Sequence, residues 1–456
     1  MTEGDTTRGG IPLEPVYRPS GEAEPSPFRR GPRESLRWEE ALVIPAGTPE
    51  EARRFWRGTL WEAAGAVTVP VDPLSWGEEG RRPFGVVLGS LHDWEELFGG
   101  MEAVEKPLYV AAFQGAPLVM ALLRAWVRKR GLNPQHLQGA LLGDPFGEGG
   151  PLPPALSLEI FLEAAEEAEA WSSFAFLSVT PLPWRWKGAT AAFEGAVALR
   201  GLRRWKAALK ARGLPAEELL RKAPLLLGLG MDFFEEVARL RALRSLWARE
   251  MEGIFPLSHG WVLLPEGEPH EPENDAIRAA LGILAGVLGG VKVIHSRPGE
   301  GTWGFPPSVA HRMPLMMQKI LKEETGVTRT ADPLGGSWFL ETLTGQLEEA
   351  MAALAEDEGI GEGDFPKEAT RPLVGRDLFG RGGEGDESPE GRRYLSRPLP
   401  PRREEARVRE ALDGVREAAR KGEGILQALE EGALGGATLE EMAKALREGW
   451  RKREDR

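Results

Sequence analysis

Short apolar runs alternate with longer amphipathic stretches between about residue 50 and residue 345. The apolar runs predict buried strands, because they are short and rich in Val, Leu and aromatic residues. They are Val67–Val71, Val86–Leu88, Leu108–Ala112, Phe174–Val179, Leu225–Leu229, Trp261–Leu264 and Val291–Ile294. The stretches between them predict amphipathic helices, as in Glu50–Ala64, Leu91–Phe98, Pro117–Arg130, Ala189–Arg212 and Asp232–Glu250. In the last helix, Asp232 followed by Glu235 predicts a capping box.

The repeated alternation of strand and helix indicates an α/β fold. About eight strand candidates over roughly 300 residues favour a (β/α)8 TIM barrel over an open sheet. We expect the barrel to occupy residues 46–350. Residues 1–45 are rich in Pro, Gly and Arg and predict an extended N-terminal arm, which either stays disordered or lies along a partner. Residues 351–403 predict a linker, and residues 404–456 a small C-terminal helical region.

The charge balance excludes several classes of protein. Lys and Arg number 57 and Asp and Glu 70, so the net charge is −13, which argues against binding to nucleic acid or to an anionic membrane. The absence of cysteine excludes disulfides, thiolate metal sites and a cysteine nucleophile. The sequence has no long apolar run and its first residues lack the apolar core of a signal peptide, so a cytoplasmic protein is expected. Few Asn and many charged residues are typical of a thermophile, although GC-rich codon bias would give the same composition.

Generic motifs give little evidence of chemistry. The run Gly299, Gly301 and Gly304 matches G-x-G-x-x-G, but Pro306 and Pro307 follow where a helix should begin, so dinucleotide binding is not expected. The six histidines include no pair three or four residues apart, which favours structural roles over metal ligation. The stripe of Met313, Met316, Met317 and Ile320 predicts packing against the barrel.

One segment is specific enough to indicate a family. Residues Glu323–Thr344, EETGVTRTADPLGGSWFLETLT, resemble the TGxTRxxDPLGGSxxxExLT motif of the methylmalonyl-CoA mutase family. Further segments resemble the same family in collinear order over about residues 50–450: Ser90–Gly100, Leu132–Asp144, Lys187–Thr190, Gly230–Ala248 and Arg371–Phe379.

The resemblance implies a radical isomerisation that interconverts methylmalonyl-CoA and succinyl-CoA. In the family, adenosylcobalamin supplies the radical, and a separate flavodoxin-like domain holds it over the C-terminal end of the barrel. The CoA moiety threads the barrel along its axis, between small hydrophilic side chains. Here the strand candidates are more apolar, which is typical of a closed and packed core.

The family's functional groups are lost at the matching positions. The Tyr-His pair that holds the thioester falls on Leu182 and Pro183, and a Gln falls on Leu142. The Arg that fixes the free carboxylate falls on Glu159, and two like charges about 4 Å apart repel by roughly 4 kcal/mol at an effective dielectric constant of about 20. Trp76 and Trp184 are large enough to fill the former cavity, although both also fit as ordinary packing or rim aromatics.

The cobalamin motif Asp-x-His-x-x-Gly is also absent, and the sequence given stops after the helices that follow the barrel. We therefore expect no catalytic, cofactor or metal site in this chain. The resemblance is strongest to the small, non-catalytic subunit of heterodimeric mutases. This implies a catalytic mutase subunit as partner, contacted through the barrel and the N-terminal arm, with adenosylcobalamin on that partner or on a separate chain.

Two alternatives remain open. The first is an active acyl-CoA mutase barrel that uses cobalamin from a separate small chain. The second is a repurposed barrel that binds CoA or another ligand, since an acyl-CoA could still enter.

Overall fold

The computed structural model describes residues 29, 37–56, 60–78, 84–99, 106–147, 149–264, 272–296, 307–357, 365–368 and 403–454. Eight parallel strands form a nearly closed barrel in the order β5-β4-β3-β2-β1-β8-β7-β6. Strands β5 and β6 are the two edges of this sheet, and a hydrogen bond between the segments that carry them joins the edges: the Val179 amide donates to the Pro224 carbonyl at 2.8 Å. The strands are β1 (Glu39–Val43), β2 (Ala66–Pro70), β3 (Leu108–Ala111), β4 (Gly139–Leu142), β5 (Phe174–Ala175), β6 (Pro224–Leu229), β7 (Leu257–Val262) and β8 (Val293–Ser296).

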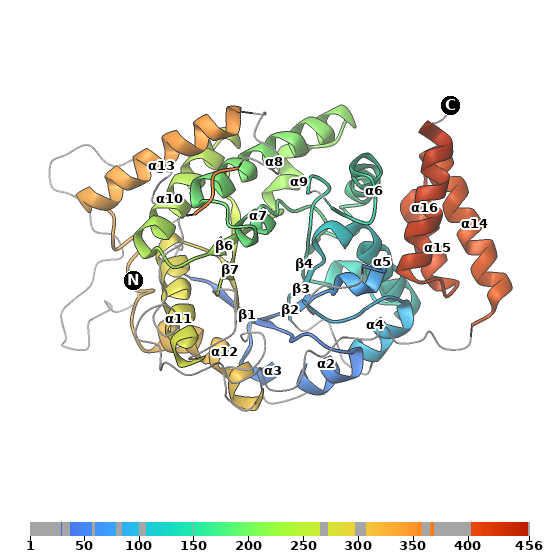
Figure 1. Ribbon diagram of the computed structural model, residues 1–456, viewed down its shortest axis with the longest axis horizontal. Helices are drawn as coiled ribbons and strands as arrows, with labels where there is room; N and C mark the ends of the chain where they lie inside the picture. The colour runs from blue at the N-terminus through green and yellow to red at the C-terminus, as the bar shows by residue number, and fades with distance from the viewer. Residues whose placement is uncertain are drawn as a thin grey trace, which may run out of the picture. The chain divides into compact units, whose positions relative to one another are not determined.

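Helices separate and follow the strands (Figure 1). The α-helices are α2 (Pro49–Trp56), α3 (Leu60–Ala63), α4 (Leu91–Phe98), α5 (Ala116–Arg130), α6 (Pro154–Glu166), α7 (Leu182–Trp186), α8 (Ala191–Ala211), α9 (Ala216–Arg221), α10 (Phe233–Glu250), α11 (Pro272–Gly289), α12 (Pro307–Glu323), α13 (Trp338–Glu356), α14 (Glu405–Lys421), α15 (Ile425–Leu434) and α16 (Leu439–Glu454). Short 3-10 helices are η1 (Pro73–Trp76), η2 (Phe113–Gly115) and η3 (Pro134–His136). None of the helices described is apolar over a long enough stretch to cross a membrane.

The contacts divide the chain into two compact units. The first comprises Met1–Leu42, Pro181–Arg203 and Leu225–Gly391, and the second comprises Val43–Thr180, Arg204–Pro224 and Arg392–Arg456. Each unit has its own buried apolar core.

The predicted barrel is confirmed. Most predicted strands match within a few residues, but Val86–Leu88 forms only isolated bridges and β4 was not among the apolar runs. Strand β1 lies inside the range predicted as an extended arm, residues 1–45. Of the rest of that arm, residues 1–28 and 30–36 lie outside the described residues, as do 358–364 and 369–402 of the predicted linker.

Part of the predicted linker is anchored. In the first unit, the Thr190 amide donates to the Pro366 carbonyl at 2.9 Å, and the Glu368 amide donates to the Gly188 carbonyl at 2.9 Å. The ring of Phe365 stacks on Phe193. Residues 365–368 are therefore fixed against the α7–α8 segment.

The interior face of β7 can be identified from its glycine. A Cβ added to Gly260 would lie 2.6 Å from the Leu229 Cδ1, and the same methyl lies against Gly286 on α11. Gly260 therefore faces the surrounding helices. Because side chains alternate along a strand, His259 and Trp261 face the barrel interior.

The predicted C-terminal helical region packs on the second unit's core. Helices α14 and α16 run side by side (Figure 1), and α15 lies on α5, whose residues 116–127 are all buried. The carboxylate of Glu163 accepts from the amides of Ile425 and Leu426, at 3.0 and 2.7 Å, and so caps the first turn of α15. The region is thus an integral part of this unit's core.

Two arginines on α5 offer a matched pair for testing this packing. Arg124 is buried and forms ion pairs with the buried Glu430 and with Glu167, whereas Arg128 pairs with Glu431 in an exposed position at 2.6 Å. We expect Arg124→Ala to lower the free energy of unfolding by about 3 kcal/mol, because it leaves a buried carboxylate unpaired. Arg128→Ala should cost less than about 1 kcal/mol. Denaturant unfolding measures both, and equal effects would contradict the proposed role of the buried pair.

Two local predictions were wrong. The Asp232 side chain makes no capping hydrogen bond at the start of α10. On α12 the deeply buried side chains are Leu315 and Gln318, whereas Ile320 is exposed and the three methionines of the stripe are half-buried. Gln318 takes the interior position because the Trp38 indole donates to its carbonyl and its amide donates to Ser296 Oγ at 2.8 Å.

Candidate functional site

Four rings lie in contact in the first unit, and we call them the aromatic column: the buried His259, His295 and Trp261, and the half-buried Trp186. His259 Nδ1 and His295 Nε2 are 3.0 Å apart in a hydrogen bond, with the rings stacked at 5.2 Å. Trp261 stacks on His295 at 5.7 Å, and Trp186 meets Trp261 edge to face at 6.2 Å. Register explains this arrangement, because Trp261 pairs directly with His295 across β7 and β8.

Both imidazoles of the column are held neutral. His259 and His295 have no exposed surface, and burial disfavours the charged form. Burial lowers the pKa of His295 to about 3. Burial, followed by the neighbouring His295, lowers the pKa of His259 well below its usual value. The pair is therefore unsuited to proton transfer near neutral pH, and it acts as packing with one internal hydrogen bond.

A cluster of buried charges lies along the edge of β6 that faces away from β7. The Leu229 carbonyl accepts from Leu263, so the amide and carbonyl of Gly228 point to the opposite side. There the Gly228 amide donates to Glu194 at 2.7 Å, and its carbonyl accepts from Arg239. Arg239 also pairs with Glu194 at 2.8 Å and with Glu236. Side chains thus satisfy backbone groups that a neighbouring strand would otherwise bind.

Glu194 is the titratable member of this cluster that lies nearest neutrality. Burial raises its pKa to about 6, against the opposing attraction of Arg239 and Arg185. Arg185, on α7, donates to Glu236 at 2.7 Å and also pairs with Glu368. Both terminal nitrogens of its guanidinium therefore already donate to protein carboxylates, which leaves it poorly suited to binding a substrate carboxylate.

The predicted equivalents of the family's substrate ligands are apolar and buried or half-buried. Leu182 begins α7 with no exposed surface, and Pro183 beside it is half-buried. In the second unit, Leu142 ends β4 and is also fully buried. None of the three side chains has a polar atom with which to hold a thioester.

Glu159 lies in a different setting from the one the sequence predicted. It lies on α6, where its carboxylate accepts from Arg212 Nη1 at 3.1 Å. The same guanidinium also pairs at 2.6 Å with Glu166, which lies about two turns beyond Glu159 on α6. A carboxylate that is already neutralised gives no support to the predicted repulsion of a diacid's free end.

The two predicted cavity-filling tryptophans differ in position. In the second unit, Trp76 is buried after β2, with its ring against Gly115, where an added Cβ would lie 2.3 Å from the indole. In the first unit, Trp184 packs edge to face on Phe193 and Phe365, at 5.4 and 5.3 Å. Trp184 thus packs with Phe193 of α8 and with Phe365. The other tryptophan of α7, Trp186, belongs to the aromatic column.

The described residues do not form a site for cobalt or another metal. No group of three His, Asp or Glu side chains among them could hold a metal ion. His259 and His295 bind each other, while His92 and His136 are exposed on α4 and η3. Since no histidine in the sequence follows Asp at two residues' distance, these residues do not fit the family's cobalt ligand.

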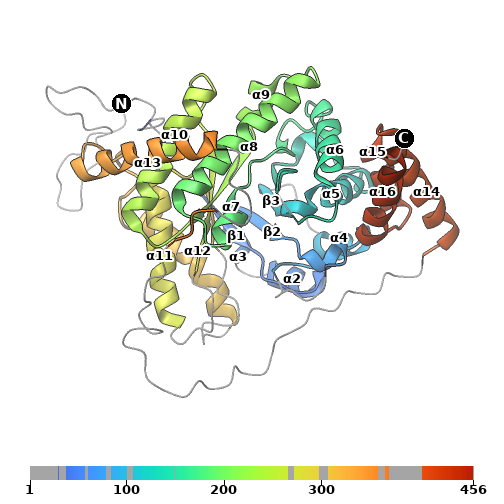
Figure 2. The ribbon, with the colours of Figure 1, turned by 45° about the horizontal axis from the view of Figure 1, so that its top comes forward.

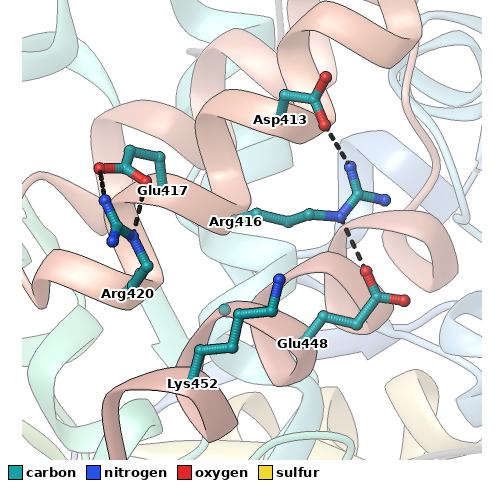
Figure 3. Close-up of a pocket in the computed structure, with 7 residues that line it drawn as sticks. Asp413, Arg416, Glu417, Arg420, Glu448 and Lys452 are labelled. Carbon is teal, nitrogen blue, oxygen red and sulfur yellow. Dashed lines mark hydrogen bonds and ion pairs between the residues drawn. The ribbon is translucent and has the colours of Figure 1, made fainter. Parts of the chain in front are cut away.

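A polar hollow lies on the C-terminal helices (Figure 3). Arg416 pairs there with Asp413 at 2.7 Å and with Glu448 at 2.8 Å. Arg420 and Glu417 form a second pair on the same helix. The charges that line the hollow largely compensate one another. They form a network of surface ion pairs rather than a catalytic centre.

The comparisons with known proteins agree with the barrel and its motif segments. A family model described as methylmalonyl-CoA mutase matches residues 7–361. The chain belongs to the methylmalonyl-CoA mutase family. The segment that indicated the family, Glu323–Thr344, is tied to α10 in this mutase-family chain: in its DPLGG turn, Asp332 pairs with the buried Arg241, which also pairs with Glu341.

Curated relatives resemble the chain at low identity over most of its length. The methylmalonyl-CoA mutase of Rhizobium meliloti is 27% identical over 93% of this chain and 68% of its own length. That of Cereibacter sphaeroides is 28% identical over 78% of this chain and 55% of the relative. The human mitochondrial methylmalonyl-CoA mutase is 26% identical over 77% of this chain and 52% of the relative. The chain thus spans from about half to two thirds of the length of these relatives.

Proposed function

We propose that this chain is a non-catalytic, structural or regulatory subunit of an adenosylcobalamin-dependent methylmalonyl-CoA mutase. In this proposal the catalytic subunit binds the acyl-CoA and the cobalamin, and this chain binds neither. Its role is to form a heteromer with that subunit in the cytoplasm.

The aromatic column carries this proposal. The family resemblance implies that CoA passes along the barrel axis, and here His259, His295 and Trp261 stack on the interior side of β7 and β8, with Trp186 edge to face on Trp261. A pantetheine chain on this side of the barrel would have to displace these rings. Their displacement would forfeit the burial of Trp261, His259 and His295 and part of that of Trp186.

The loss of substrate ligands supports the same conclusion. Leu142 and Leu182 present only hydrocarbon at the positions matched to a Gln and a Tyr, and Arg185 is bound by Glu236 and Glu368. Nothing at these positions replaces the hydrogen bonds that a thioester carbonyl and a free carboxylate require.

A turnover assay of the purified chain tests the proposal. The chain is incubated with methylmalonyl-CoA and adenosylcobalamin, alone and with a separately expressed cobalamin-binding chain, and succinyl-CoA is measured. We expect no product in either case, and no heat of binding when succinyl-CoA is titrated into the chain. Product formed only with the added cobalamin-binding chain would instead establish an active barrel. Binding without turnover would establish a repurposed CoA-binding barrel.

A further inference from the structure

An aromatic surface lies where α10 and α13 begin. It consists of Met231, Phe234, Trp338 and Phe339, which are 40%, 47%, 88% and 60% exposed. Phe234 and Phe339 meet edge to face at 5.6 Å, which joins the two helices into one surface. The helices lie alongside each other in both views (Figure 2). Helix α10 follows the end of β6, so this surface lies at the C-terminal rim of the barrel.

The exposed tryptophan is held in a fixed position. The DPLGG turn before it is tied to α10 by the pair between Asp332 and Arg241. The amide of Gly336 donates to Glu341 at 3.1 Å, and Ser337 caps the helix that begins with Trp338. Gly336 has φ +88°, which a residue with a side chain rarely adopts. An exposed aromatic residue on a fixed backbone is typical of a binding hot spot, because the backbone loses little entropy when the residue is covered.

The size of the surface is in the range of an interaction site. Three large aromatic side chains with these exposures present roughly 450 Å² of area. The largest apolar patch on a monomer is usually about 300–600 Å² and often functional. Each partner of a standard interface buries about 800 Å², so the aromatic surface could supply about half of one side.

The charges around this surface restrict what can cover it. Asp232 and Glu235 flank Phe234 in sequence, whereas Glu341, one turn beyond Trp338, is already paired with Arg241 and Arg29. Burial, followed by the neighbouring Asp232, Glu236 and Glu368, raises the pKa of Glu235. A second copy related by a twofold axis would oppose this acidic rim to itself, on a chain of net charge −13. The rim therefore favours a different chain with basic residues around an apolar pocket.

The N-terminal region reaches the same helix. Arg29 donates to Glu348 on α13 at 2.9 Å and also pairs with Glu341, next to the aromatic surface. Its carbonyl accepts from the buried Arg244 on α10. Arg29, which belongs to the range expected to lie along a partner, is thus held beside the aromatic surface.

We propose that the aromatic surface is the docking site for the catalytic mutase subunit, with Trp338 as its central anchor. This inference rests on the proposed function and specifies the surface through which the heteromer forms. The covering face of the catalytic chain is expected to present an apolar pocket bordered by Arg or Lys.

Co-purification with a quantified affinity tests this proposal. The full chain is co-expressed with the mutase chain of the same organism that carries Asp-x-His-x-x-Gly, and Kd is measured by light scattering and titration. We expect Trp338→Ser to raise Kd by at least about 30-fold and Trp338→Ser/Phe339→Ser to abolish the complex. Ile277→Ser is the matched control, since Ile277 on α11 is also 60% exposed. Its Kd should stay unchanged, and all variants should keep the wild-type melting temperature.

The outcomes separate the surface from the function. If the wild-type chain forms the heteromer and the double variant binds with the same Kd, the docking site is overturned and the proposed subunit role is left intact. A wild-type chain that binds no mutase chain would overturn the subunit role itself. A homodimer of the wild-type chain that the double variant converts to a monomer would overturn the choice of partner and assign the surface to a second copy.

Discussion

Replacing Arg239 with methionine is expected to remove most of the chain's stability. Arg239 has no exposed surface, and it pairs with Glu194 and Glu236, which are also buried. Methionine fills a similar volume but removes the cation between the two carboxylates and leaves the Gly228 carbonyl without its donor. Glu194 then keeps only the Gly228 amide as a hydrogen-bond donor, and Glu236 keeps Arg185. Breaking one buried pair costs about 3–5 kcal/mol, and domains are stable by only about 5–15 kcal/mol. We therefore expect a loss of about 5 kcal/mol.

The loss should shrink as the pH falls. Glu194 already has a raised pKa of about 6, and without Arg239 its protonated form is favoured further. A carboxyl with a raised folded-state pKa is stabilising below its unfolded pKa of about 4.5, and this contribution is lost as pH rises through the folded value. Arg239→Met should therefore be less destabilising at pH 5 than at pH 8.

Arg203→Met is the control for this prediction. Arg203 pairs with Glu250 at 2.8 Å and with Glu356 at 2.7 Å, but in a partly exposed position. Its replacement should cost less than about 1 kcal/mol. Chemical unfolding of both variants at the two pH values measures the difference. Two variants of equal stability, or a larger loss for Arg239→Met at the lower pH, would contradict the role given to the buried cluster.

Mild acid is expected to destabilise the barrel through the histidines of the aromatic column. Both imidazoles have depressed folded-state pKa values, with His295 at about 3. Their contribution to stability is complete above the unfolded pKa of about 6.5 and is lost as pH falls toward the folded values. For each histidine the slope rises from about 0.7 kcal/mol per pH unit at pH 6.5 to about 1.4 near pH 5, so the pair should cost roughly 3 kcal/mol over this range.

Other groups titrate in the same window, so the effect must be measured as a difference. Glu194 acts in the opposite direction, because its raised pKa favours the folded state as pH falls from about 6. The variant His259→Leu/His295→Leu removes the column's contribution and retains that of Glu194. The slope of its stability against pH should be smaller than that of the wild-type chain, by about one proton at pH 6.5 and about two at pH 5. His136→Gln, at an exposed position on η3, should leave the dependence unchanged. An identical slope for the wild type and the double variant would contradict the neutral buried pair.

Local patterns predicted most of the barrel but missed its first strand. Strand β1 begins with Glu39 and Glu40, two charged residues that do not read as a buried strand. Glu40 is nevertheless buried, because Lys322 and Lys319 from α12 reach its carboxylate at 2.9 and 3.3 Å. Such pairing depends on residues about 280 positions away, which no local pattern can report.

The candidate site likewise has a part that the sequence predicted and a part that depends on distant residues. The resemblance to the mutase family is confirmed, and it directed attention to the segment of Leu182 and Pro183. It did not reveal the aromatic column, because His259 and His295 are 36 residues apart and come together only through the register of β7 and β8. The predicted strand Trp261–Leu264 began two residues after His259 and so excluded it. If the predicted strand had been extended two residues toward its N-terminus, the alternation of side chains would have placed His259 on the same face as Trp261.

Native mass spectrometry of the chain affinity-purified from its own cells tests the subunit assignment most directly. We predict a stable complex with a larger mutase chain, in which cobalamin remains on the partner after the subunits are dissociated in the gas phase. A homo-oligomer, or a complex with only a small cobalamin-binding chain, would contradict the assignment.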